Sequence, residues 1–245
     1  MPDSVDTLDA EARASSTEHD ERNSTSTEIF SPLLRLPAEL RLIIYELHLA
    51  SKVWYDPNSG FYRIYICDFR VRSRRDWLRS MFHVNRQLRV EFSEYIRKTA
   101  TFAMYTFHSP SELMALSGHI RSLMAHVEIR NHNYDNVFPT FQERVENLSS
   151  RNGFTHLQKL DLVVECSGPR ECHGIAKVVS KWFKLHGTPL KPLEEGNESL
   201  KEVVVESLCY HPDATRKRVT WFRYFRVGQK LVRDTEVQAE MVRRT

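Results

Sequence analysis

Glycine is scarce in this chain, which has only eight in 245 residues. Phosphate-binding loops need several glycines close together, because the backbone must approach the phosphates. The spacings G-x-G-x-x-G, G-x-x-x-x-G-K-[ST], G-x-S-x-G and H-E-x-x-H are all missing. The sequence therefore carries no signature of nucleotide binding, serine hydrolysis or zinc proteolysis. We predict that the protein is not an enzyme and needs no cofactor.

Long hydrophobic runs are missing too. No stretch reaches the roughly 18 apolar residues that a transmembrane helix needs, so we expect no membrane span. The first residues, MPDSVDTLDAEARASS, are acidic and lack the basic-then-apolar order of a signal peptide. We expect a cytoplasmic or nuclear protein that is not secreted.

Cysteine and histidine give no recognisable metal site. The zinc-type ligands cluster late in the chain, at Cys166, Cys172, His173, His186, Cys209 and His211. Their spacing matches no zinc-finger pattern, and cysteines in a reducing compartment are usually thiols. We predict that the protein holds no metal.

Charge is divided unevenly along the chain. Residues 1–29 carry eight acids against two arginines, a net charge of −6, so a formal total of +3 leaves +9 for the rest. The same 29 residues hold almost no large apolar side chain and cannot offset the entropy of ordering. We predict a disordered acidic tail rich in Ser and Thr over residues 1–29.

The segment Leu36-Pro37-Ala38-Glu39-Leu40-Arg41 predicts the start of a helix that runs to about Ala50. Proline fits the first helical position without losing a hydrogen bond, and an acid in the first turn suits the helix dipole. Apolar residues recur at helical spacing: Leu40, Ile43, Ile44 and Leu47. Another side holds Arg41, Tyr45 and His48. The apolar stripe packs on its own domain, the interpretation we favour, or docks a partner.

The residues after Ala50 predict a succession of strands and helices. The turn cluster at 56–60 (DPNSG) between two β-prone runs predicts a hairpin. A single helix is expected from about Arg75 to Lys98, a strand over 101–107 and a short helix opened by Ser109-Pro110. A loop is expected over 188–199, then a strand over 221–227 and a polar, helix-like tail.

Three segments share one pattern, an apolar-x-x-apolar lead into an alternating strand. They begin at Ile120, Leu157 and Leu200, which are 37 and 43 residues apart. Helices are expected before the second and third, at 141–148 and 175–185. Such helix–strand units predict a parallel or mixed sheet flanked by helices. The spacing exceeds that of leucine-rich repeats, about 20–29 residues, so the pattern is only repeat-like.

Residues 32–45, PLLRLPAELRLIIY, resemble the opening of the fungal two-EXR domain family, often labelled F-box-like. Glu39-Leu40-Arg41 matches the first E-x-R. The family's second block is similar to residues 84–89, VNRQLR, although Gln87 replaces the second acid and puts in doubt any role of that carboxylate. The resemblance covers about residues 30–165 and implies no known activity. It also implies an F-box-like docking helix, since Leu36, Pro37, Glu39, Leu40, Ile44 and Tyr45 fit an F-box opening.

The sequence thus predicts a mixed α+β fold with an N-terminal F-box-like helix, a hairpin insertion and helix–strand units. We expect a two-EXR-like domain over residues 30–165 and a C-terminal extension over 166–245, packed on the same sheet. A structural ion pair is expected between the two motif blocks, from Glu39 or Arg41 to the second block, whose motif residues are Asn85, Arg86 and Arg89.

Three functional hypotheses follow. The first is a non-catalytic protein-interaction module, an F-box-like adaptor for a Skp-type ubiquitin-ligase partner, docking through Leu36, Pro37, Glu39, Leu40, Arg41, Ile44 and Tyr45. The second is a nucleic-acid binder that uses two basic clusters interleaved with aromatics: Arg70, Arg72, Arg74, Arg75 and Arg79, then Arg216, Lys217, Arg218, Arg223 and Arg226. Because Asp68, Asp76 and Asp213 dilute these clusters, we favour a solvated face over a nucleic-acid partner. The third is a diverged enzyme whose residues converge only in space.

Overall fold

The computed structural model describes residues 32–57, 59–67, 72–83, 85–105, 110–131, 137–166, 190–210 and 216–234. The tail predicted over residues 1–29 and the helix predicted over 175–185 lie outside these ranges. The helical elements are η1 Pro32–Arg35, α1 Ala38–Ala50, α2 Arg72–His83, α3 Arg86–Thr99, α4 Pro110–Ala115, α5 Gly118–Leu123, α6 Val137–Asn147, η4 Ser150–Asn152 and α8 Lys191–Gly196.

Eight strands form one sheet, and they lie side by side in chain order. They are β1 Trp54–Asp56, β2 Phe61–Tyr65, β3 Ala100–Tyr105, β4 His126–Asn131, β5 Lys159–Cys166, β6 Glu202–Tyr210, β7 Arg216–Val227 and β8 Lys230–Arg233. The five strands from β2 to β6 are parallel, and antiparallel pairs close both ends. The predicted mixed α+β class, with a sheet flanked by helices, is confirmed.

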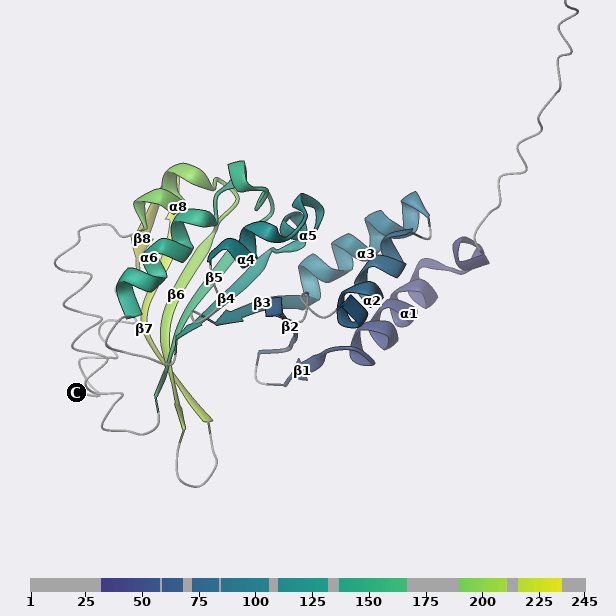
Figure 1. The fold of residues 1–245 in the computed structure, drawn as a ribbon, viewed down its shortest axis with the longest axis horizontal. Coiled ribbons are helices and arrows are strands. Elements are labelled where there is room, and N and C mark those ends of the chain that lie inside the picture. The colour runs from purple at the N-terminus through teal and green to yellow at the C-terminus, as the bar shows by residue number, and fades with distance from the viewer. Residues whose placement is uncertain are drawn as a thin grey trace, which may run out of the picture. The chain divides into compact units, whose positions relative to one another are not determined.

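The helices gather on one face of this sheet. Parallel crossovers are almost always right-handed, and a strand order that always advances in one direction then places every crossover helix on the same side. Helices α4, α5, α6 and α8 follow this rule and lie along one side of the strands (Figure 1). Helix α3 contacts α5, and α1 and α2 contact α3.

The apolar core lies between the sheet and these helices. Alternate residues of neighbouring strands meet in rows across the sheet, and one row runs Met104, Ile129, Leu162, Val205 and Phe222. All five side chains are buried. Because side chains alternate between faces along a strand, the residues between them point to the opposite, polar face.

Only the second and third of the three repeated leads share a backbone arrangement. The first, beginning at Ile120, is the last part of helix α5, whereas the other two are extended and run straight into β5 and β6. The carbonyl oxygen of Ala125, just before β4, accepts hydrogen bonds from the amides of Gln158 and Lys159, at 2.7 and 3.0 Å. The carbonyl of Gln158 does the same for Lys201 and Glu202, at 2.8 and 3.1 Å. The starts of β4, β5 and β6 are therefore joined in the same way from one strand to the next.

The hairpin prediction is confirmed. Strands β1 and β2 pair antiparallel, with Tyr55 opposite Tyr62. Gly60 has φ +73°, a left-handed conformation that glycine adopts without strain, and its amide bonds to the carbonyl of Asp56 at 2.9 Å. The hairpin is not an isolated insertion, because β2 continues into the parallel part of the sheet beside β3.

Three local predictions are wrong. The single helix expected over 75–98 is two helices, because Asn85 has extended backbone angles and its side chain caps α3 by accepting from the amide of Gln87. The loop expected over 188–199 contains α8, and Pro192 sits in its first turn, where proline is tolerated. The helix-like tail expected after residue 227 begins as strand β8, joined to β7 through Gly228 at φ +61°.

The C-terminal strands belong to the same sheet as the earlier ones. Strand β6 pairs with β5 along its length, and the boundary expected at residue 165 falls inside β5. The division into residues 30–165 and 166–245 stays a prediction. Among the described helices, none combines the length and the apolar character that crossing a membrane requires.

Candidate docking surface

Helix α1 carries most of the residues that the sequence assigned to partner binding. Its first turn is closed by the carbonyl of Pro37, which accepts from the amides of Leu40 and Arg41. Glu39 lies in that first turn and is exposed. The backbone of Pro37 thus starts the helix without a side-chain cap.

The inward side of α1 is formed by Arg41, Tyr45 and Leu49. Arg41 forms a two-point ion pair with Glu91 on α3, at 2.8 Å from Nε to Oε2 and 2.9 Å from Nη2 to Oε1. Its Nη1 donates to the carbonyl of Leu36. The hydroxyl of Tyr45 donates to Glu91 at 3.1 Å, and its ring lies 5.4 Å from that of Phe92.

This cluster shifts the protonation equilibria of its members. The hydrogen bonds from Arg41, more than any other contact, lower the pKa of Glu91. The hydrogen bond to Glu91 likewise raises the pKa of Arg41. Burial first, and Glu91 second, raises the pKa of Tyr45 to about 12. The carboxylate and the guanidinium therefore stay charged near neutral pH, and the pair holds α1 against α3.

The outward side of α1 is apolar. Leu40, Ile43 and Leu47 are 46%, 51% and 65% exposed. We call these three residues the α1 stripe. The predicted stripe also included Ile44, and the interpretation that it packs on its own domain is wrong for the other three residues, because Arg41, Tyr45 and Leu49 take the inward positions. For the same reason Arg41 and Tyr45 are not available to a partner, whereas Pro37, Glu39 and Leu40 are exposed and Leu36 and Ile44 are half-buried.

The second motif block supports this arrangement indirectly. Asn85 caps α3, and the side chain of Gln87 donates to Oε1 of Glu91 at 3.0 Å. The ion pair expected from the first block to Arg86 or Arg89 is not seen, because both arginines are exposed; Arg41 instead pairs with Glu91, two residues beyond the second block. Sequence reasoning missed Glu91, because nothing in the local pattern marks which acid of α3 faces α1.

The polar face of the sheet is the second cluster of charged residues. Arg63 on β2 pairs with Asp56 at 2.8 Å and with Glu128 on β4 at 3.0 Å. Arg130 on β4 pairs with Glu128 and, at 3.0 Å, with Glu165 on β5. All five side chains are buried. Burial by itself lowers the pKa of Arg130, but Glu128 and Glu165 outweigh burial and raise it. Each of the three carboxylates is paired with at least one of the two guanidinium groups, which indicates a structural role for the cluster.

A Thr–His–Asp hydrogen-bond chain lies on the same face. Oγ1 of Thr101 is 2.8 Å from Nδ1 of His126, whose Nε2 is 2.7 Å from Oδ2 of Asp161. These residue types activate nucleophiles in hydrolases. Here all three side chains are buried, at 2%, 7% and 4% exposure, so a substrate cannot reach the threonine hydroxyl. These hydrogen bonds join strands β3, β4 and β5. The buried threonine is not an accessible nucleophile, so this triplet does not support the enzyme hypothesis.

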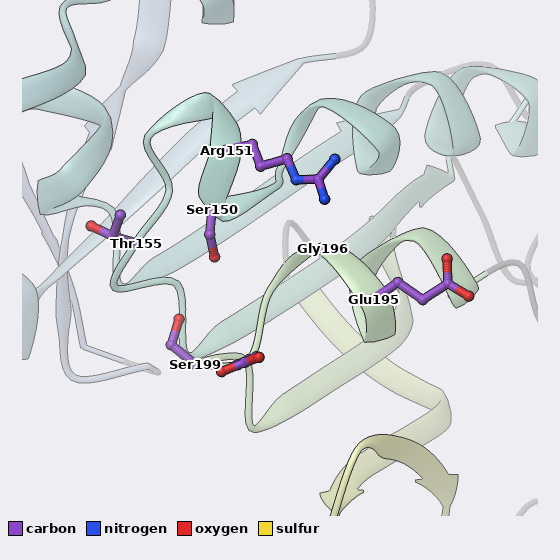
Figure 2. Close-up of a pocket in the computed structure, with 7 residues that line it drawn as sticks. Ser150, Arg151, Thr155, Glu195, Gly196 and Ser199 are labelled. Atoms are coloured by element: carbon purple, nitrogen blue, oxygen red, sulfur yellow. The ribbon is translucent and has the colours of Figure 1, made fainter.

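A depression of about 680 Å³ opens beside η4 and α8. Figure 2 shows its lining, with Arg151 and Glu195 at one end and Thr155 and Ser199 at the other. The hydroxyl of Ser199 is already engaged, 2.9 Å from the carbonyl of Leu157 and 2.7 Å from Oδ1 of Asn197. One arginine and two glutamates, Glu195 and Glu198, share the lining, so the depression favours no single class of charged ligand.

The basic clusters give no phosphate-binding surface in the part of the chain that is described. Nε of Arg223 lies 3.2 Å from Glu202, and Arg226 donates to the carbonyls of Leu193, Asn197 and Leu200. The remaining arginines of both clusters have side chains outside the description. The same holds for the Cys/His set: Cys166 and Cys209 are register partners on β5 and β6, but their side chains are not described. No metal-type cluster occurs among the residues that are described.

No family model matches the chain, and no curated protein or solved structure matches it either. The functional assignment therefore depends on the residues and their geometry. Of the surfaces described above, the α1 stripe is the one formed by large apolar side chains that would usually be buried.

Proposed function

We propose that this chain is a non-catalytic protein-interaction module that docks a protein partner on the α1 stripe. The observation that carries the proposal is the orientation of α1. Helix α1 buries Arg41, Tyr45 and Leu49 but leaves Leu40, Ile43 and Leu47 exposed, so these three apolar side chains are available to another surface. An apolar helix face of this kind fits a groove or a second helix.

The rigid attachment of α1 supports the same proposal. The two-point pair between Arg41 and Glu91 fixes the rotation of the helix, so the stripe is presented outward before a partner arrives. Preorganisation of this kind lowers the entropic cost of binding. The resemblance of residues 36–45 to an F-box opening makes a Skp-type ubiquitin-ligase adaptor the first partner to test.

Direct binding to a purified adaptor tests the proposal. The full chain and a Leu40→Asp/Leu47→Asp variant are compared by surface plasmon resonance against a recombinant Skp-type adaptor. Both substituted side chains are exposed, so the variant should fold, which circular dichroism and thermal unfolding check. Val227→Asp is the matched control, since Val227 is 64% exposed on β7.

The expected result is binding by the wild type and by the control, and at least about a tenfold loss in the stripe variant, since burying charge at an apolar contact costs more than about 1.4 kcal/mol. If the adaptor does not bind, affinity capture from the native cell with quantitative mass spectrometry follows. Interactors retained equally by the wild type and by the folded stripe variant would reject the α1 stripe as a docking surface.

A further inference from the structure

The outward side of α1 is bordered by charge of one sign. Glu39 and Glu46 are both exposed, and neither forms an ion pair within the described part of the chain. Residues three or four apart are neighbours on a helix surface. Glu39 is therefore next to Ile43, and Ile43 is next to Glu46. By this spacing the two carboxylates border the α1 stripe on one side over about two helical turns, at the boundary where the charge of Glu46 also acts on Tyr62 and Tyr95.

This combination selects a partner by both shape and charge. The stripe repeats at positions i, i+3 and i+7, which match the apolar positions of an antiparallel or parallel partner helix. Two unpaired carboxylates beside it attract lysine or arginine at the rim of such a contact and repel acids.

A second copy of this chain is a poor fit to the same surface. A two-fold interface would place the same patch on both sides, so four carboxylates would meet around one small apolar contact. Like charges at that distance oppose association. The carboxylates therefore favour a different chain over self-association through α1.

We propose that the partner docks an amphipathic α-helix on the α1 stripe, with lysine or arginine side chains facing Glu39 and Glu46. This inference rests on the proposed function, because it names the chemistry of the partner at the same surface. Steering by the two acids makes association faster and tighter at low ionic strength, and added salt weakens it.

Two designed peptides probe the surface directly. Both are 18-residue amphipathic helices with one leucine stripe, and they differ only in carrying lysine or glutamate beside it. Binding of each labelled peptide to the full chain is measured by fluorescence anisotropy at low and high salt. The wild type is compared with Glu39→Gln/Glu46→Gln, with Leu40→Ser/Leu47→Ser and with the control Val227→Ser.

The lysine peptide should bind the wild type about five- to tenfold more tightly than the glutamate peptide at low salt, as two exposed charge pairs allow. The preference should fall to within about twofold in Glu39→Gln/Glu46→Gln and at high salt. The acidic residues 1–29 are retained in every variant, so any attraction from them persists. The change on Glu39→Gln/Glu46→Gln then isolates the helix carboxylates.

The outcomes separate the inference from the proposed function. Loss of the lysine preference in Glu39→Gln/Glu46→Gln supports the inference. Equal binding of both peptides by the wild type, or a preference unchanged in that variant, overturns the inference; if Leu40→Ser/Leu47→Ser still abolishes binding, the proposed function survives. Binding of neither peptide, or binding untouched by Leu40→Ser/Leu47→Ser, overturns both.

Discussion

Arg41 and Glu91 are fifty residues apart in the chain, yet their side chains form two parallel hydrogen bonds, of 2.8 and 2.9 Å, between α1 and α3. A fork-to-fork contact of this kind fixes orientation as well as distance. It requires Arg41 to face inward, and the spacing of the helix then turns the α1 stripe outward. This ion pair, with the buried Tyr45 and Leu49, therefore determines which side of α1 is exposed.

Removing the arginine should loosen α1. In Arg41→Met, Glu91 loses its charged partner, the donors described beside it then being the neutral Tyr45 and Gln87, and the urea midpoint should fall. Tyr45→Phe removes one hydrogen bond to Glu91 and should cost about 1 kcal/mol, less than Arg41→Met. Glu39→Gln changes an exposed acid on the same helix and serves as the control. Equal midpoints for Arg41→Met and Glu39→Gln would contradict a structural role for the pair.

The same pair predicts how stability responds to acid. Hydrogen bonds from Arg41 lower the pKa of Glu91 in the folded protein. The stabilisation is complete above the ordinary glutamate pKa, about 4.3, and is lost as the pH falls through the lower folded-state value. Urea unfolding between pH 6 and pH 3 should show this loss, and Glu91→Gln should reduce it. If the unfolding free energy of the variant fell just as steeply with decreasing pH, the acid sensitivity would come from other groups.

A second titration concerns His119. His119 is exposed overall, but partial desolvation of its ring, more than the nearby Arg89 and Arg97, lowers its pKa in the folded protein. The unfolded chain therefore binds a proton first, and stability should fall as the pH drops below about 6.5 until the folded-state pKa is passed. His119→Gln should flatten the unfolding free energy in that window. A slope that persists in the variant would point to another histidine.

The polar face of the sheet should be sensitive to the loss of one charge. Arg130 and Glu128 are both almost fully buried, and Arg130→Met removes one ion-pair partner from Glu128 and one from Glu165. Breaking a buried pair costs about 3–5 kcal/mol, and thermal unfolding should register it. Arg151→Met, at an exposed arginine, should stay within about 0.5 kcal/mol of the wild type. If the loss of stability in Arg130→Met were as small as that in Arg151→Met, the polar face would tolerate the removal of this arginine.

The edge strand β8 is blocked by a carboxylate. Oε1 of Glu194 on α8 accepts a hydrogen bond from the outward amide of Leu231 at 2.7 Å. Exposed amides on edge strands invite pairing with another chain. Glu194→Ala should increase concentration-dependent self-association in light scattering, whereas Glu195→Ala, next to it and exposed, should not. Monomeric behaviour of Glu194→Ala at high concentration would show that the edge is protected by other means.

Local patterns predicted many elements but not their breaks. Turn residues at 56–60 identified the hairpin, and the apolar leads located β4, β5 and β6, because these signals lie within a few residues of the structure they specify. The break between α2 and α3 was missed because apolar spacing continues across it, while the cap is a single side chain, Asn85. Helix α8 was missed because six residues carry too little periodicity to outweigh its Pro and Gly.

The sequence by itself determined that α1 begins next to Pro37, that it has two distinct sides and that the strands alternate between an apolar and a polar face. The tertiary structure alone decided which side of α1 turns inward, and that the partner of Arg41 is Glu91. Periodicity is a property of neighbouring residues, whereas the inward side depends on partners supplied fifty residues later by another helix.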